Sequence, residues 1–239
     1  TKAMTIDLNG KTLQAAVNKA SAGLLTLNAA VEVTIKDSKT GGKIINEIAR
    51  NSEIRTIFVN KAGATLTLES GTIAVNNLGQ YASAAATVNG VAVAKYASCA
   101  ARAIHQIAGT TVNIKGGKLE AKGTRSVYGI YQVSSAATNE AGTTVLNVTG
   151  GEIAVEAPYN ALGIYAYGKV NMSAGVINTH ITTNLIDAAY AADHGNNTNN
   201  GYGYGILMKV SVSATASSCY YGTLNMTGGT INVISDRTK

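Results

Sequence analysis

A ten-residue repeat recurs along this chain, with an apolar–polar–apolar piece on each side of a glycine-containing turn. Its clear copies are Leu66–Val75, Val112–Ala121, Leu146–Val155, Val170–Thr179 and Leu224–Val233, and a looser relative begins at Val33. Alternation with a period of two on both sides of a turn predicts two short β-strands per copy. Because one such unit cannot bury its apolar side alone, the copies must stack on one another.

The spacing between repeats predicts a solenoid. The repeat glycines are Gly71, Gly117, Gly151, Gly175 and Gly229, and a shorter motif is centred on Ala103, Gly129, Gly163 and Gly205. One full turn, from Gly151 to Gly175, spans 24 residues, whereas the junctions after Gly71 and Gly175 are longer. A corner that is tight in some turns and long in others is typical of a solenoid coil. The pattern therefore predicts an all-β, single parallel β-helix of about six coils, with roughly three short strands per coil and loop insertions near 76–100 and 180–203.

Residues 1–45 are expected to form an opening coil or cap region, and residues 46–239 the coils. Alternation on both sides of Asn9-Gly10, a strong turn dipeptide, predicts a strand before and after it. Leu24–Asn28 and Val31–Lys36 have the pattern of two more strands. Gln14–Ala22 has a weak apolar face that suits a helical turn or a cap over the open end.

The apolar positions of each repeat should face the core, and the polar residues between them should face outward. In register, the outward positions form one column of Thr67, Asn113, Asn147, Asn171 and Asn225. Stacked amides can hydrogen-bond along the stacking direction, so we expect a structural ladder. A flat binding face for glycan or ice is the alternative. Asn147, Asn171, Asn196 and Asn225 begin Asn-X-Ser/Thr sequences, which are expected as by-products of the repeat.

The shorter motif supplies the candidate ligand or partner face. If its isoleucines are in the core, Gly129, Gly163 and Gly205 face outward as a track without side chains, beside a column of His105, Tyr131 and Tyr165. Such a face can stack on sugar rings or receive a strand of another protein, and simple aromatic covering of the sheet is the other interpretation. A slip of one residue would invert the set.

Composition limits the function further. Only 13% of residues are charged, the net charge is +6 and the pI is about 9.2. The basic residues are scattered, which suits solubility or weak attraction to an acidic polymer but not a nucleic-acid site. No apolar run is long enough for a membrane span, and residues 1–30 lack the order of a signal peptide. Cys99 and Cys219 have no metal-site spacing, and a disulfide or two thiols are both open.

A catalytic, cofactor-binding or metal site is not expected. The 13 acidic residues do not recur in register. Asp187, Asp193 and His194 lie close in sequence, and an ordinary polar loop tip explains them better than a site does.

Residues DLNGKTL at 7–13, VTIKDS at 33–38, GGKI at 41–44 and GATLTLESGTI at 63–73 resemble the repeats of large bacterial surface proteins. Those proteins have a right-handed parallel β-helix of the pectin-lyase-like kind. The resemblance is good over the first third of the chain and continues as the ten-residue repeat. It implies an architecture, but that superfamily includes adhesins, lyases, hydrolases and phage tailspikes.

We therefore expect a non-catalytic, extracellular or cell-surface structural and adhesive solenoid. Its expected partners are a glycan or surface polymer and further copies of itself, stacked end to end. A polysaccharide lyase or glycoside hydrolase is the first alternative and predicts at least three charged side chains that converge on one face. A phage or bacterial receptor-binding spike is the second and predicts a trimer.

Overall fold

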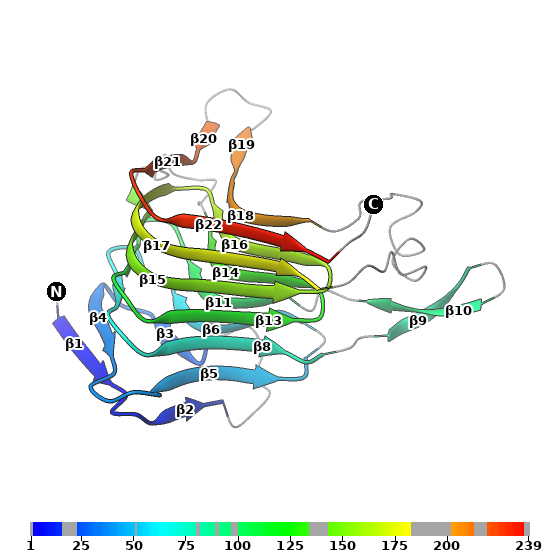
Figure 1. The fold of residues 1–239 in the computed structure, drawn as a ribbon, viewed down its shortest axis with the longest axis horizontal. Coiled ribbons are helices and arrows are strands. Elements are labelled where there is room, and N and C mark those ends of the chain that lie inside the picture. Colours follow the sequence, from blue (N-terminus) through cyan, green and yellow to red (C-terminus); the bar gives the residue numbers. More distant parts are fainter. Residues whose placement is uncertain are drawn as a thin grey trace.

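The structure is a computed structural model, and it describes residues 2–15, 23–50, 52–79, 82–88, 91–96, 100–133, 143–182, 202–212 and 219–236. These residues form strands and no helix. Most strands pair in parallel with strands from other repeats, in stacked sheets (Figure 1). The prediction of an all-β fold with parallel, solenoid-like stacking is confirmed.

Three parallel ladders run through the molecule, and each repeat contributes to the first two. The first ladder pairs, in order, β1 (Lys2–Asp7), β4 (Val31–Lys36), β7 (Thr65–Leu68), β12 (Thr111–Ile114), the first parts of β15 (Val145–Ala157) and β17 (Lys169–Ile181), and β21 (Thr223–Met226). The second pairs β2 (Thr12–Gln14), β5 (Lys43–Ile48), β8 (Thr72–Asn77), β13 (Lys118–Gly123), the second parts of β15 and β17, and β22 (Thr230–Ser235).

The third ladder comes from the shorter motif. It pairs β3 (Leu25–Leu27), β6 (Ile54–Val59), β11 (Ala101–Gln106), β14 (Ser126–Gln132), β16 (Asn160–Ala166) and β18 (Gly203–Met208). Strands from residues 1–45 thus take part in the same three ladders as the rest of the chain.

The repeat glycines turn the chain from the first ladder into the second. Gly71, Gly117, Gly151, Gly175 and Gly229 all have positive φ, between 68° and 94°, which glycine adopts without the steric cost of a side chain. A Cβ atom at Gly117 would also lie 2.5 Å from the carbonyl oxygen of Gly71 in the neighbouring coil. Backbone conformation and close stacking both favour glycine here, so the predicted turn is confirmed.

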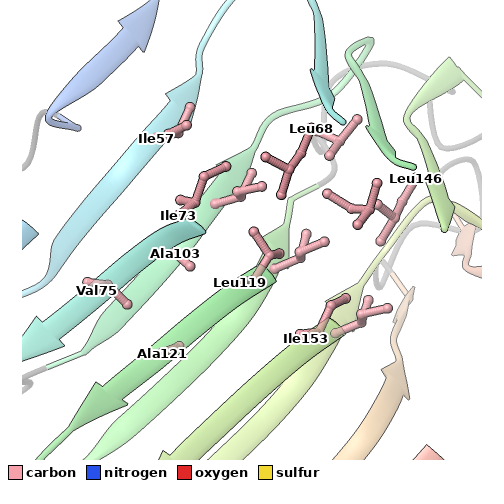
Figure 2. Close-up of a cluster of buried hydrophobic side chains, with 14 of the residues drawn as sticks. Ile57, Leu68, Ile73, Val75, Ala103, Leu119, Ala121, Leu146 and Ile153 are labelled. Carbon is pink, nitrogen blue, oxygen red and sulfur yellow. The ribbon is translucent and has the colours of Figure 1, made fainter. Parts of the chain in front are cut away.

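The core lies between the ladders and is almost entirely aliphatic. Figure 2 shows Leu68, Ile73, Leu119, Leu146 and Ile153 directed into this interior, and each is at most 1% exposed. The predicted core positions from Leu66 to Met172 are buried. Leu224 and Met226 were expected in the core as well, but each is 42% exposed, because within the described residues no strand pairs with the far side of β21.

The insertions leave the stack at the corners. The first contains the antiparallel hairpin of β9 (Ala82–Val88) and β10 (Val91–Tyr96), which projects from the body (Figure 1). A second hairpin, β19 (Val210–Val212) with β20 (Cys219–Tyr221), follows β18. Most of the insertion at 180–203 lies outside the described residues. So does most of the predicted cap at Gln14–Ala22, although Gln14 itself ends β2.

We expect Leu119→Ala to destabilise the protein by about 2–5 kcal/mol. Leu119 is fully buried at the centre of the second ladder, and its truncation leaves a cavity that neighbours on both adjacent coils cannot fill. The measurement is the shift of the urea unfolding midpoint. Leu78→Ala, at a side chain that is 51% exposed, is the control and should change stability by no more than about 0.5 kcal/mol. Equal effects would contradict the assignment of the core.

Candidate functional site

The outer face of the third ladder carries a continuous aromatic column. Register places Phe58, His105, Tyr131 and Tyr165 opposite one another on β6, β11, β14 and β16, and we call these four residues the aromatic column. The predicted alignment of His105, Tyr131 and Tyr165 is therefore confirmed, and Phe58 extends it. Parallel pairing in register makes this unavoidable, because one position of the motif is aromatic in successive coils.

Both faces of Tyr131, in the middle of the column, are already covered. Tyr131 and Tyr165 are stacked with centroids 4.8 Å apart and planes 4° apart. The guanidinium carbon of Arg102 lies 3.5 Å from the centroid of Tyr131. Arg102 belongs to β11 and Tyr165 to β16, on opposite sides of β14, so both faces of Tyr131 are occupied. A sugar ring therefore has no open face to stack on at Tyr131.

Most of the other ring contacts in and beside the column are edge to face. His105 meets Tyr131 in a T-shaped contact with centroids 5.2 Å apart, and it lies 4.7 Å from Phe58 in a tilted arrangement. Tyr128 makes T-shaped contacts with Tyr131 and Tyr165, at 5.0 and 5.7 Å. Such contacts are the favoured geometries of aromatic pairs and stabilise the sheet beyond simple burial.

The prediction that Gly129, Gly163 and Gly205 form an outward track is wrong. All three glycines are buried. A Cβ atom would lie 2.5 Å from Cγ2 of Ile153 at Gly129 and 2.4 Å from Cγ2 of Ile177 at Gly163, and at Gly205 it would clash with Ile231. The glycines face the second ladder across the core and allow the two sheets to approach.

The error arose because the alternation fails at this motif. Gly129 and Ile130 are both buried, although they are consecutive. Strict period-two counting therefore places the glycine on the wrong side of the strand.

A charged cluster lies against the aromatic column. Glu53, just before β6, forms an ion pair with Arg55 through Nε and accepts a bond of 2.7 Å from Arg102. Arg102 also donates to Nδ1 of His105 at 3.2 Å. The Arg102 side chain is only 12% exposed. We call Glu53, Arg55, Arg102 and His105 the charged cluster.

Burial and the two arginines set the protonation state of His105. Desolvation, followed by the positive charges of Arg102 and Arg55, lowers the pKa of His105 from 6.5 to about 2. The ring is therefore neutral near pH 7. Since Nδ1 accepts from Arg102, the proton must be on Nε2, which is buried and has no hydrogen-bond partner.

The tyrosines beside the cluster also remain in their neutral form. Burial raises the pKa of Tyr128 to about 12. Burial also raises the pKa of Tyr131 and of Tyr165, and the hydrogen bond to Tyr167 adds to the shift of Tyr165. Desolvation lowers the pKa of Arg102, while Glu53 opposes that shift. These phenols are poor candidates for a base near neutral pH.

The charged cluster supplies the number of converging charges that a β-helix lyase or hydrolase would need, but not the right kind. Its one carboxylate, Glu53, is held by two arginines, whereas those reactions use several carboxylates. In the described part of the chain, no group of three or more His, Cys, Asp or Glu side chains is placed to hold a metal ion. Asp187, Asp193 and His194 lie outside that part.

The predicted column of Thr and Asn side chains lies on the outer face of the first parallel ladder. Hydrogen bonds confirm this amide ladder for four of its five members. Asn113 donates to Oγ1 of Thr67 at 3.2 Å, Asn147 donates to Asn113 at 2.8 Å, and Asn171 donates to Asn147 at 2.8 Å. Asn225 is in register with Asn171 at the next step. Because the amide groups bond to one another, the structural interpretation explains this column.

Exposed aromatic rings occur next to the column rather than in it. Tyr202 and Tyr204 are 42% and 39% exposed, with centroids 5.1 Å apart and planes tilted by 51°. Tyr204 on β18 is in register with Leu162 on β16, which is in register with Tyr128 on β14, so the three residues share one column. Lys209 lies against the aromatic column, with its ammonium 5.9 Å from the centroid of Tyr165.

Sequence reasoning missed Glu53, Arg55, Phe58 and the roles of Arg102 and Tyr128. The signal for two of them was present, since Arg55-Thr56-Ile57-Phe58 repeats the pattern of Arg102-Ala103-Ile104-His105. The inserted hairpin between these segments obscured the repeat. Cys99 lies outside the described residues, so its pairing with Cys219 stays open.

Comparison with family models, with curated proteins and with solved structures gave no match. A search of the described residues found no helix suited to crossing a membrane.

We expect His105 to make stability depend on pH between 5 and 7. Its pKa is about 2 in the folded protein and 6.5 when exposed, so the unfolded chain binds the extra proton first and stability falls as the pH falls. The loss at pH 5 relative to pH 7 should be about 2 kcal/mol larger in the natural protein than in His105→Phe. Urea unfolding at both pH values measures it. Identical losses in the two proteins would refute a buried, neutral His105.

Proposed function

We propose that this protein is a non-catalytic, extracellular structural and adhesive β-solenoid of the cell surface. In this proposal its three ladders form one closed, right-handed, pectin-lyase-like helix of three strands per coil, with six complete coils followed by β21 and β22. The first part of each repeat would give the first strand of a coil, the second part the second strand, and the shorter motif the third.

One observation carries the structural role: equivalent side chains stack on both sides of the sheets, coil after coil. Aliphatic columns fill the interior, an amide ladder follows the first ladder, and the aromatic column follows the third. Across the second ladder, Lys118 of β13 lies 3.4 Å from Glu152 of β15, so an ion pair also joins neighbouring coils. An arrangement in which each outward column supports its neighbours suits a rigid spacer.

The adhesive role is assigned to the exposed tyrosine pair. Glycan binding needs open aromatic faces together with polar groups at their edges. Tyr131 has no open face, whereas Tyr202 and Tyr204 are both substantially exposed and lie on the same outer surface. The partner would be a glycan or surface polymer.

Binding to a panel of immobilised neutral and acidic polysaccharides tests this role. We expect the natural protein to be retained by at least one polysaccharide, and Tyr202→Ala and Tyr204→Ala to lose retention because they remove the open rings. Leu78→Ala, exposed elsewhere on the surface, should bind normally. Retention that survives both tyrosine substitutions, or no retention at all, would reject the adhesive site. Release of shorter saccharides during incubation would instead favour the lyase or hydrolase.

Self-association is the second part of the proposal, and its partner is another copy of the same chain. Exposed Leu224 and Met226 occupy the same interior columns as Met4 and Ile6, six pairing steps away. The outward column likewise runs from Thr5 to Asn225. Strand β1 of one copy placed on β21 of another would therefore continue both columns without a change of register.

We expect the purified chain to form end-to-end filaments in electron microscopy, with lengths that grow with concentration. Met226→Lys should shorten them, because the new charge would have to enter an interior column. Leu78→Lys is the matched control and should leave them intact. Monomers at all concentrations would reject stacking, and a discrete trimer would favour the receptor-binding spike.

A further inference from the structure

Two tyrosines at the end of the third ladder have their hydroxyl groups in contact. Tyr165 lies in β16 and Tyr167 follows that strand, so their side chains leave the same side of the backbone. The Oη atoms are 3.3 Å apart, the centroids 5.6 Å apart, and the ring planes make an angle of 70°. Both side chains are half-buried.

This geometry resembles the product of phenol coupling. When two tyrosines join through the ring carbons next to their hydroxyl groups, the hydroxyls end up adjacent and the rings are twisted relative to one another. Adjacent Oη atoms and a large interplanar angle place the two ortho carbons on the approaching sides of Tyr165 and Tyr167. To form the carbon–carbon bond, the two rings need to move closer together but do not need to flip.

Other tyrosine pairs also lie close together, and Tyr128 meets Tyr131 and Tyr165 edge to face with centroids 5.0 and 5.7 Å apart. The rings of Tyr131 and Tyr165 are nearly parallel and stacked, with centroids 4.8 Å apart, so their π faces rather than their ortho carbons meet. Tyr131 is also held on its other face by Arg102. Tyr202 and Tyr204 are close, with centroids 5.1 Å apart, and they are the main competitors.

We propose that Tyr165 and Tyr167 are a site of oxidative modification, at which a peroxidase with hydrogen peroxide forms an intramolecular dityrosine. Each phenol loses its hydroxyl hydrogen to give a radical. The two radicals form one carbon–carbon bond at their ortho positions, and the ortho hydrogens move to the oxygens, which restores both phenols. One peroxide accepts the two hydrogen atoms, as two protons and two electrons, and leaves as two water molecules.

The chain favours this outcome in a second way. It contains no tryptophan, which would otherwise compete with tyrosine for one-electron oxidation. Tyr128, Tyr131 and Tyr165 are in ring contact, so a radical formed on one can pass to Tyr165. The product links the end of β16 covalently to the bend that leads into β17, and this inference is independent of the glycan-binding role.

Treatment of the folded protein with horseradish peroxidase and hydrogen peroxide tests the proposal. At low protein concentration we expect dityrosine fluorescence in the monomer band, together with a mass lower by two hydrogens and fragment ions that place the bond between Tyr165 and Tyr167. Tyr165→Phe and Tyr167→Phe should each reduce the fluorescence to that of untreated protein. Both substitutions remove only a hydroxyl group, so the fold is retained and circular dichroism checks it.

Tyr202→Phe is the matched control and should keep the full signal. A signal that survives Tyr167→Phe, that disappears in Tyr202→Phe, or that is confined to covalent dimers would overturn the proposal. So would an absence of dityrosine under conditions that couple free tyrosine.

Discussion

Parallel pairing at a fixed register is the constraint on which this structure depends. Backbone hydrogen bonds set adjacent strands about 4.8 Å apart, so every side chain meets its counterpart from the neighbouring coil. A residue type is then tolerated only if it can stack on itself or on its neighbour. Aliphatic groups do so by dispersion, amides by hydrogen bonds and aromatic rings by their faces or edges. Each of these solutions occurs in a column of its own.

Stacking also decides which surfaces are free to bind. A side chain whose surfaces are occupied by its neighbours along the stack has no free surface for a ligand. Tyr131 is an example, with Arg102 on one face and Tyr165 on the other. The charged cluster is similar, because Glu53 is committed to two arginines and His105 cannot take up a proton near neutral pH. Exposed aromatic rings are found at the last described strand of the third ladder and just before it, at Tyr204 and Tyr202.

Much of the architecture could be predicted from the sequence, because the repeat fixes it locally. The alternation at Leu66 and Leu68 identifies a strand and its buried side, and Gly71 identifies the turn. The amide ladder followed from the same register. The orientation of Gly163 could not be obtained this way, since two successive residues face inward at that corner. The charged cluster depends on the pairing of β6 with β11. The hairpin inserted between these two strands hides that pairing in the sequence.

The amide ladder has a direction. In every step seen, the amide nitrogen donates toward the preceding coil, from Asn171 to Asn147, from Asn147 to Asn113, and from there to Thr67. On the neighbouring ladder, the step from Asn232 to Asn178 points the same way. Dipoles aligned head to tail add, as peptide dipoles do in a helix. The amide ladder therefore has an axial polarity, with its N–H groups directed toward β1 and its carbonyl groups toward β21, so the two directions along the stack are electrostatically unlike.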